Sequence, residues 1–149
     1  MAKCSDVMTR EPVSCEPDEA VSRVAELMKR QDVGAVPVIE TAASRRLIGI
    51  ITDRDIVVKV VAAGRDAQSA AVREAMTSNP ATCLEDEDVR EAVSRMADRQ
   101  VRRIPVVDRE GRLCGIIAQA DIATRVQQDK TTGELVEAIS EPGTARKQA

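Results

Sequence analysis

Hydrophobic and polar positions along the chain follow two patterns, one typical of amphipathic helices and one typical of buried strands. Between Pro17 and Met28, apolar residues recur at intervals of three and four, as they do on the buried face of a helix. The segments 35–39 and 47–52 are continuously apolar, which is typical of short strands covered on both faces of their sheet. The segment 53–63 predicts a closing helix, which we expect to end at Gly64.

The same order of elements is predicted again in the second half of the chain. With a short strand at 13–15, each repeat reads as strand, helix, strand, strand and helix, so we expect an α/β fold built from two such repeats. The second copy is predicted to contain a helix over 85–99, strands over 103–107 and 113–118 with a tight turn over 108–111, and a closing helix over about 119–128.

Individual residues repeat as well. The matching residues are Met8 with Met76, Thr9 with Thr77, Cys15 with Cys83, Pro37 with Pro105 and Gly49 with Gly115. A repeat of this length is a supersecondary unit of its own, and two copies usually bury their apolar faces against each other, which creates two related sites along the seam. We expect repeats at 5–64 and 72–128, a polar linker at 65–71, and a C-terminal tail at 129–149 whose segment 133–139 is compatible with a short helix.

Composition narrows the classes of function. The chain carries 22 basic and 25 acidic residues, a formal charge of −3, mixed without a basic stripe, so neither nucleic acid nor a membrane surface is an expected partner. It contains no histidine, phenylalanine, tyrosine or tryptophan, which removes the imidazole that general acid–base catalysis uses most often. No apolar run is long enough to span a bilayer and the opening residues do not form a signal peptide, so we expect a cytoplasmic protein.

The four cysteines, Cys4, Cys15, Cys83 and Cys114, form no Cys-x-x-Cys pair. In a chain without histidine this spacing gives no zinc-binding pattern, so no metal site is expected. Cys15 and Cys83 occupy equivalent positions in short strand-like stretches, where a cysteine is usually a small buried residue. A redox pair is the alternative.

The strand-to-helix junction of the first repeat carries the most informative polar residues. Free backbone N–H groups and the positive end of a helix dipole favour a phosphate there. Asp55 can accept hydrogen bonds from a ribose diol, while Arg54 offers a planar fork to phosphate oxygens. The alternative is structural, because Thr52 and Asp55 have the spacing of a capping box. In the second repeat Ala118 breaks this box although Asp121 remains, which capping alone does not explain.

Two arginines mark the start of an apolar strand in the second repeat. Arg102 and Arg103 stand where the first repeat has Gly34 and Ala35. A solvated strand entry is one interpretation, and a pair of phosphate-binding side chains is the other. On the second interpretation, the chain has one well-equipped anion site and one poorer site.

These features together resemble a known family. Each repeat carries a hydrophobic-Pro-Val motif in its middle strand, ends in Gly-hydrophobic-hydrophobic-x-x-x-Asp and opens with Met-Thr. The pattern is similar to tandem CBS (cystathionine-β-synthase-type) domains, also called a Bateman module, over about residues 5–128. The resemblance implies an α/β fold in which two β-α-β-β-α repeats pack about a pseudo-two-fold axis. It also implies a dimeric regulatory protein that is not itself an enzyme, requires no cofactor and binds an adenosine-containing ligand: AMP, ADP, ATP, S-adenosylmethionine or NAD.

The resemblance also assigns residues to two ligand clefts, each built from the terminal aspartate of one repeat and the first two strands of the other. The first cleft would use Thr52, Arg54, Asp55, Thr82, Cys83, Val101, Arg102 and Arg103. Asp55 would hold the ribose hydroxyls, and Thr52 with the arginines would hold the phosphates. Backbone near Cys83 and Val101 would contact the adenine edge. The second cleft would use Asp121, Ser14, Cys15, Gly34, Ala35 and Val36; without the arginine pair it suits an uncharged nucleoside or stays empty.

The leading functional hypothesis is a nucleotide-sensing module that reports energy or cofactor state to an unidentified partner. One alternative is a ligand-free scaffold for dimerisation or interaction. Another is a thiol redox sensor, for which Cys4 near the N-terminus would be the exposed thiol. We also expect a homodimer, because the segment 56–61 has more apolar residues than one buried helix face needs.

Overall fold

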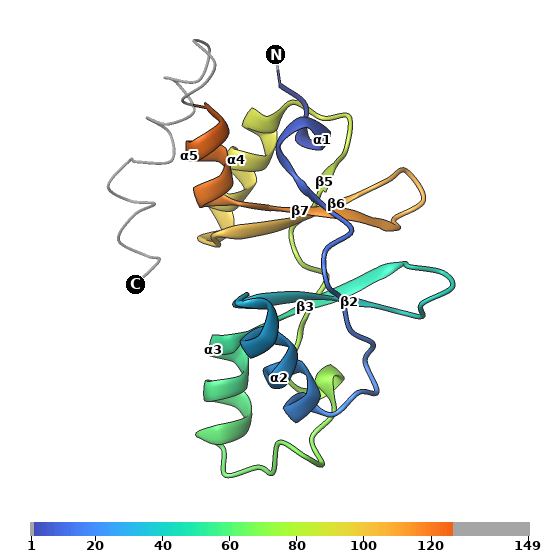
Figure 1. The fold of residues 1–149 in the computed structure, drawn as a ribbon, viewed down its shortest axis with the longest axis vertical. Coiled ribbons are helices and arrows are strands. Elements are labelled where there is room, and N and C mark those ends of the chain that lie inside the picture. The colour runs from blue at the N-terminus through green and yellow to red at the C-terminus, as the bar shows by residue number, and fades with distance from the viewer. Residues whose placement is uncertain (1, 127–149) are drawn as a thin grey trace. The chain divides into compact units, whose positions relative to one another are not determined.

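The computed structural model describes residues 2–126, and Figure 1 shows its helices and strands. The helices are α1 (Cys4–Val7), α2 (Val21–Gln31), α3 (Asp53–Ile56), the π-helix η1 (Val57–Val61), the 3₁₀-helix η2 (Val72–Glu74), α4 (Val89–Arg99) and α5 (Gln119–Val126). The strands are β1 (Thr9–Arg10), β2 (Ala35–Ile39), β3 (Leu47–Thr52), β4 (Thr77–Ser78), β5 (Cys83–Leu84), β6 (Arg103–Val107) and β7 (Leu113–Ala118). The predicted α/β class is confirmed. The tail predicted at 129–149, with its helix at 133–139, lies outside the described residues.

The chain forms two compact units, and each takes one strand from the start of the other repeat. The first unit is Pro12–Pro80, and its edge strand β4 comes from the start of the second repeat. The second unit consists of the described parts of Met1–Glu11 and Ala81–Ala149, and its edge strand β1 comes from the start of the first repeat. The repeats at 5–64 and 72–128 are defined by the sequence and remain a prediction. The compact units differ from them, because each unit contains the leading segment of the other repeat.

The first unit contains a three-stranded sheet in the order β2-β3-β4. Strands β2 and β3 pair antiparallel, from Ala35 opposite Thr52 to Ile39 opposite Leu47. Helices α2 and α3 contact each other and lie on one face of these two strands (Figure 1). All five side chains of β2 are buried, as its continuous apolar sequence predicts.

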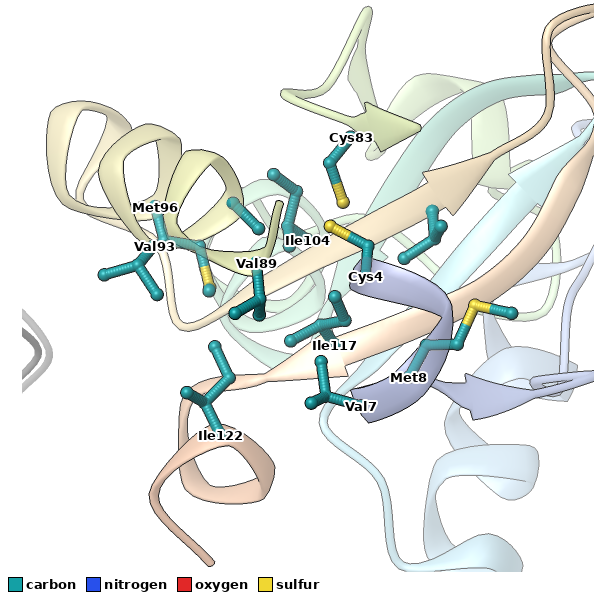
Figure 2. Close-up of a cluster of buried hydrophobic side chains, with 12 residues drawn as sticks. Cys4, Val7, Met8, Cys83, Val89, Val93, Met96, Ile104, Ile117 and Ile122 are labelled. Carbon is teal, nitrogen blue, oxygen red and sulfur yellow. The ribbon is translucent and has the colours of Figure 1, made fainter. Parts of the chain in front are cut away.

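The second unit contains a four-stranded sheet in the order β1-β7-β6-β5, in which only β5 and β6 run parallel. Figure 2 shows the hydrophobic cluster against this sheet. Ile104 and Ile117 come from β6 and β7, and Ile122 from α5; all three are fully buried. Helix α1 contacts α4, α5 and β7, so the N-terminal segment is part of this core.

Two glycines explain why the Met-Thr motif recurs. A Cβ atom on Gly49 would lie 2.8 Å from Met76 Sδ and 2.9 Å from the Thr77 carbonyl oxygen. A Cβ atom on Gly115 would lie 2.5 Å from Met8 Sδ. In each unit, therefore, the glycine of the central strand makes room for the Met-Thr segment that forms the edge of the sheet.

Helices α2 and α4 begin about one turn later than the sequence predicts, so both predicted starts were wrong. In each case a carboxylate closes a turn that precedes the helix. Glu19 accepts a hydrogen bond from the backbone N–H of Glu16 at 2.6 Å, and Glu87 accepts one from the N–H of Leu84 at 2.7 Å. Acidic residues favour a first helical turn and such a closing contact equally, because both need an acceptor for a free N–H group.

Two further predicted elements of the first repeat needed correction. The strand predicted at 13–15 is reduced to a single bridge between Cys15 and Val38. The closing helix predicted at 53–63 is α-helical only in α3 and continues as the π-helix η1. Gly64 follows it with a φ of 73°, in the left-handed region that glycine adopts without strain.

The segment predicted as a linker, 65–71, contributes a residue to the first unit at its end. Ala70 is buried in the core of the first unit. Its carbonyl oxygen accepts the backbone N–H of Val21 at 2.9 Å, at the start of α2. The end of this segment therefore belongs to the fold of the first unit, because it supplies an acceptor to a helix N-terminus that lacks a side-chain cap.

Candidate functional site

Asp55 stands at the junction of β3 and α3 and closes a capping box. Its Oδ2 atom accepts the Thr52 N–H at 3.0 Å, and the Thr52 hydroxyl accepts the Asp55 N–H at 3.0 Å. The other carboxylate oxygen pairs with Lys59 Nζ at 3.2 Å, one turn along the helix. Lys59 in turn donates to the Ala75 carbonyl oxygen at 3.1 Å. The structural role that the spacing predicted for Asp55 is therefore present, and 14% of its side chain stays exposed.

The start of β2 lies beside this junction. Ala35 is opposite Thr52 in the ladder, and the Asp53 N–H donates to the Gly34 carbonyl oxygen at 2.9 Å. A Cβ atom on Gly34 would lie 3.1 Å from Asp53 Oδ2, so a larger residue would crowd that carboxylate. The Arg54 side chain is exposed at the same end of the sheet. Ala35 and the adjacent Val36 are buried, which leaves only their backbone for contact with a ligand.

The corresponding end of the second unit carries two arginines. Arg103 lies opposite Ala118 in the ladder of β6 and β7, and the first N–H of α5 donates to the Arg102 carbonyl oxygen at 2.8 Å. Val101 precedes them with an exposed side chain. Asp121 lies in the first turn of α5, where Ala118 offers no hydroxyl for a capping box. This end of the second sheet therefore corresponds to the Asp55 junction of the first, but it carries more positive charge.

Cys15 and Cys83 contribute core side chains in their respective units. The backbone N–H and carbonyl oxygen of Cys15 both bond to β2, at 3.0 and 2.8 Å. The half-buried neighbours Ser14 and Thr82 are better placed to meet a ligand. The Thr82 carbonyl oxygen already accepts a hydrogen bond from Arg95 Nη1 at 3.1 Å.

The sequence interpretation missed the network around Arg95. This residue of α4 makes two hydrogen bonds to the Glu87 carboxylate, both at 2.7 Å. Hydrogen bonds from Arg95 are the main reason that the pKa of Glu87 lies below its usual range. The first repeat has Leu27 at the position of Arg95, so the difference was visible in the sequence. Nothing local marked Glu87 as the partner.

Each predicted cleft draws residues from both compact units. The first unit brings together Ser14, Cys15, Gly34, Ala35, Val36, Thr52, Arg54 and Asp55 around β2 and the start of α3. The second unit brings together Thr82, Cys83, Val101, Arg102, Arg103 and Asp121 around β6 and the start of α5. The two clefts themselves stay a prediction.

Two further features of residues 2–126 bear on function. Within that range, no group of three or more cysteine and acidic side chains is arranged to hold a metal ion. None of the helices in the same range combines the length and the apolar character needed to cross a membrane.

Comparison with known proteins agrees with the resemblance seen in the sequence. The family model described as CBS domain matches residues 4–62 and again residues 72–128. The CBS domain-containing protein YhcV of Bacillus subtilis (strain 168) is 35% identical over 144 residues, which cover 94% of this chain and 96% of that protein.

Two solved structures share the fold at comparable similarity. Hypoxic Response Protein I, a protein of Mycobacterium tuberculosis crystallised with two coordinated zinc ions, has 34% sequence identity and a TM-score of 0.76, covering 83% of this chain and 98% of its own. The CBS domain pair of protein MJ0100, crystallised with 5′-methylthioadenosine and S-adenosyl-L-methionine, has 25% identity and a TM-score of 0.76, covering 87% and 99%.

Proposed function

The chain belongs to the CBS domain family, with one match in each repeat, and we propose that it is a regulatory module that binds an adenosine-containing ligand and signals to a partner protein. The observation that carries this proposal is a difference between two equivalent strand ends. One end presents the Thr52 and Asp55 junction, which suits a ribose, and the other presents Arg102 and Arg103, which suit a phosphate. A nucleotide needs both kinds of contact.

The capping box and the proposed ribose contact are compatible. A carboxylate has about four lone-pair positions for hydrogen bonds. Two contacts to Asp55 are made within the first unit, from the Thr52 N–H and from Lys59 Nζ. The remaining lone pairs can accept the two hydroxyls of a ribose, so ligand binding does not require the helix to lose its cap.

The choice among ligands depends on the arginines. MJ0100 was crystallised with two adenosine derivatives that carry no phosphate. That structure therefore supports the adenosine group of the proposed ligand but not its phosphate. In this chain Arg102 and Arg103 add charge-assisted hydrogen bonds that favour AMP, ADP, ATP or NAD over S-adenosylmethionine. We therefore propose that Asp55 and the arginine pair contact one phosphorylated ligand. We assign Asp121 to a second and weaker site, because the cleft predicted for it takes Gly34 and Ala35 in place of the arginines and has Ala118 in place of a threonine.

We further propose a homodimer formed through η1. Val57, Val58 and Val61 are 56%, 48% and 63% exposed, whereas Val60 faces the core. An apolar helical face of this kind is stabilised when a second copy covers it. Sedimentation equilibrium at micromolar concentration should give twice the 16.1 kDa chain mass. A 16.1 kDa species alone would contradict the dimer.

We also propose that the chain is cytoplasmic and catalyses no reaction itself. Ligand binding would be communicated to the partner through the dimer.

A thermal-shift panel tests the function directly. AMP, ADP, ATP, NAD and S-adenosylmethionine are compared with guanosine monophosphate and ribose 5-phosphate as controls. A ligand at 100 times its dissociation constant stabilises the folded state by about 2.7 kcal/mol, which corresponds to a rise in Tm of roughly 5–10 °C for a chain of this size. Shifts for adenosine ligands but not for the controls are expected. No shift with any of them would favour a ligand-free scaffold instead.

A further inference from the structure

Cys4 and Cys83 lie next to each other in the core of the second unit, although they are far apart in the sequence. Figure 2 shows their sulfur atoms pointing toward one another, Cys4 from α1 and Cys83 from the segment of β5. The two side chains belong to one buried cluster, and neither forms a disulfide. Their exposed fractions are 0% and 1%. The prediction that Cys4 is an exposed thiol was therefore wrong, because the N-terminal segment is bound into the second unit.

In the first unit, Val72 occupies the position that Cys4 occupies in the second unit. The Val72 N–H donates to the Glu19 carbonyl oxygen at 2.9 Å, just as the Cys4 N–H donates to the Glu87 carbonyl oxygen at 2.8 Å. Val72 and Cys15 lie in one buried cluster, as Cys4 and Cys83 do in the other. The same structural position thus accepts valine, so packing alone does not require a cysteine at position 4.

We propose that Cys4 and Cys83 form a redox-modification site at which a hydroperoxide oxidises the two thiols to an intramolecular disulfide. The bond would join α1 to β5 within the second unit. It uses the Cys83 side chain, whereas the ligand proposal uses only the backbone near Cys83, and it involves neither the Asp55 junction nor the arginine pair.

The local environment assigns the two thiols different roles. Contact with the Cys83 thiol lowers the pKa of Cys4, while the same contact and burial raise the pKa of Cys83. With hydrogen peroxide as the oxidant, the Cys4 thiolate attacks one peroxide oxygen, so that an S–O bond forms, the O–O bond breaks and the leaving hydroxide takes up a proton to become water. The Cys83 sulfur then attacks the sulfenic acid of Cys4, an S–S bond forms, the S–O bond breaks, and a second water leaves with the Cys83 proton. One hydroperoxide accepts the two electrons that the two thiols lose.

Access to the buried pair requires only a small part of the fold to open. Helix α1 has only four residues. Its first turn is held by the Cys4 and Ser5 N–H groups, which donate to the turn before α4 at 2.8 and 2.9 Å. A short segment held by few backbone hydrogen bonds can open locally at a lower free energy than the whole fold. A small oxidant such as hydrogen peroxide can then reach Cys4.

The decisive experiment compares the full chain with Cys4→Val and Cys114→Ser after treatment with hydrogen peroxide. Cys4→Val copies the residue of the first unit and should therefore fold. Cys114 is the matched thiol outside the pair: its Sγ donates to the Glu85 carboxylate at 3.0 Å, and burial raises its pKa to about 12. Free thiols are counted under denaturing conditions, and linked peptides are identified by mass spectrometry.

For the parent and for Cys114→Ser, we expect a loss of two thiols per chain, a Cys4–Cys83 linked peptide and no increase in chain mass on a non-reducing gel. A cross-link that closes so long a loop should raise Tm by roughly 5–10 °C, reversibly on reduction. Cys4→Val should neither lose a pair of thiols nor gain stability after the treatment. Retention of all thiols, a link to Cys114, cross-linking between chains, or oxidation of Cys4 to sulfinic acid without a link would each overturn the proposal.

Discussion

Gly115→Ala adds one methyl group at the most crowded point of the second sheet. Strand β7 carries Gly115 opposite Arg10 of β1, and the new atom would lie against the Met8 and Thr9 segment that forms the edge. Its Cβ would lie 2.5 Å from Met8 Sδ and 2.8 Å from the Thr9 carbonyl oxygen. The methionine side chain can move, but the Thr9 carbonyl belongs to the backbone of β1. We therefore expect β1 and α1 to shift away from the sheet.

Two opposing effects decide the sign of the change in stability. Replacing glycine by alanine restricts the unfolded chain and stabilises by about 0.4–1 kcal/mol where the folded backbone accepts it. Forcing an extra methyl group into a packed core costs about 1–3 kcal/mol. Steric overlap with backbone at this distance places the cost in the upper part of that range, so the net expected loss is roughly 1–2 kcal/mol.

Urea unfolding followed by circular dichroism measures this loss, with Met8→Ala and the double variant completing a cycle. Met8→Ala alone should cost about 2–5 kcal/mol because it leaves a cavity. In the double variant the alanine Cβ meets one neighbour fewer, so the combined loss should be smaller than the sum of the two single losses. A Gly115→Ala protein as stable as the parent, or strictly additive losses, would refute the steric reasoning.

Two other substitutions test the polar contacts. Arg95→Leu, which installs the residue of the first repeat, should cost about 1 kcal/mol at neutral pH, a modest value because the Arg95 side chain is 38% exposed. Since the pKa of Glu87 is lowered in the folded state, this stabilisation is complete above the unfolded pKa near 4.3 and is lost as the pH falls through the folded pKa. Urea unfolding at pH 7 and pH 3 should thus show a difference that closes in acid, and a pH-independent difference would contradict the ion pair. Thr52→Ala removes one hydrogen bond of the capping box and should lower the free energy of unfolding by about 1 kcal/mol. Thr52→Ser keeps the hydroxyl and should stay near the parent. Equal losses in the two variants would exclude capping as the cause.

The two long strands of each repeat could be predicted to the residue, and the reason is physical. The segments Ala35–Ile39 and Arg103–Val107 are buried almost throughout, so their sequences are apolar apart from the half-buried Arg103, and they end where polar residues begin. The Thr52 and Asp55 capping box was equally visible, because it depends on spacing within one turn. Lys59 could have been found by the same rule, since residues four apart on a helix are neighbours.

Features that depend on distant parts of the chain could not be predicted in this way. The exchange of β1 and β4 between the compact units leaves no local signal, and the burial of Cys4 against Cys83 follows from that exchange. The late starts of α2 and α4 were missed because Glu19 and Glu87 bond backward to a turn, which their residue type does not distinguish from a first helical turn. For the same reason the sequence could not show how the predicted site residues come together, since these residues are divided between two units.

Isothermal titration calorimetry with AMP and ATP tests most directly whether Asp55 and the arginine pair form one nucleotide site. The parent is compared with Asp55→Asn, which retains an acceptor for the Thr52 N–H, and with the matched variant Asp121→Asn. Loss of hydrogen bonds to a charged acceptor costs about 1.5–3 kcal/mol, so Asp55→Asn should weaken binding by one to two decades while Asp121→Asn leaves it unchanged. Binding in the parent should also weaken with added salt, because exposed charge pairs are screened. Loss of binding in Asp121→Asn with parental affinity in Asp55→Asn would contradict this assignment of the ligand.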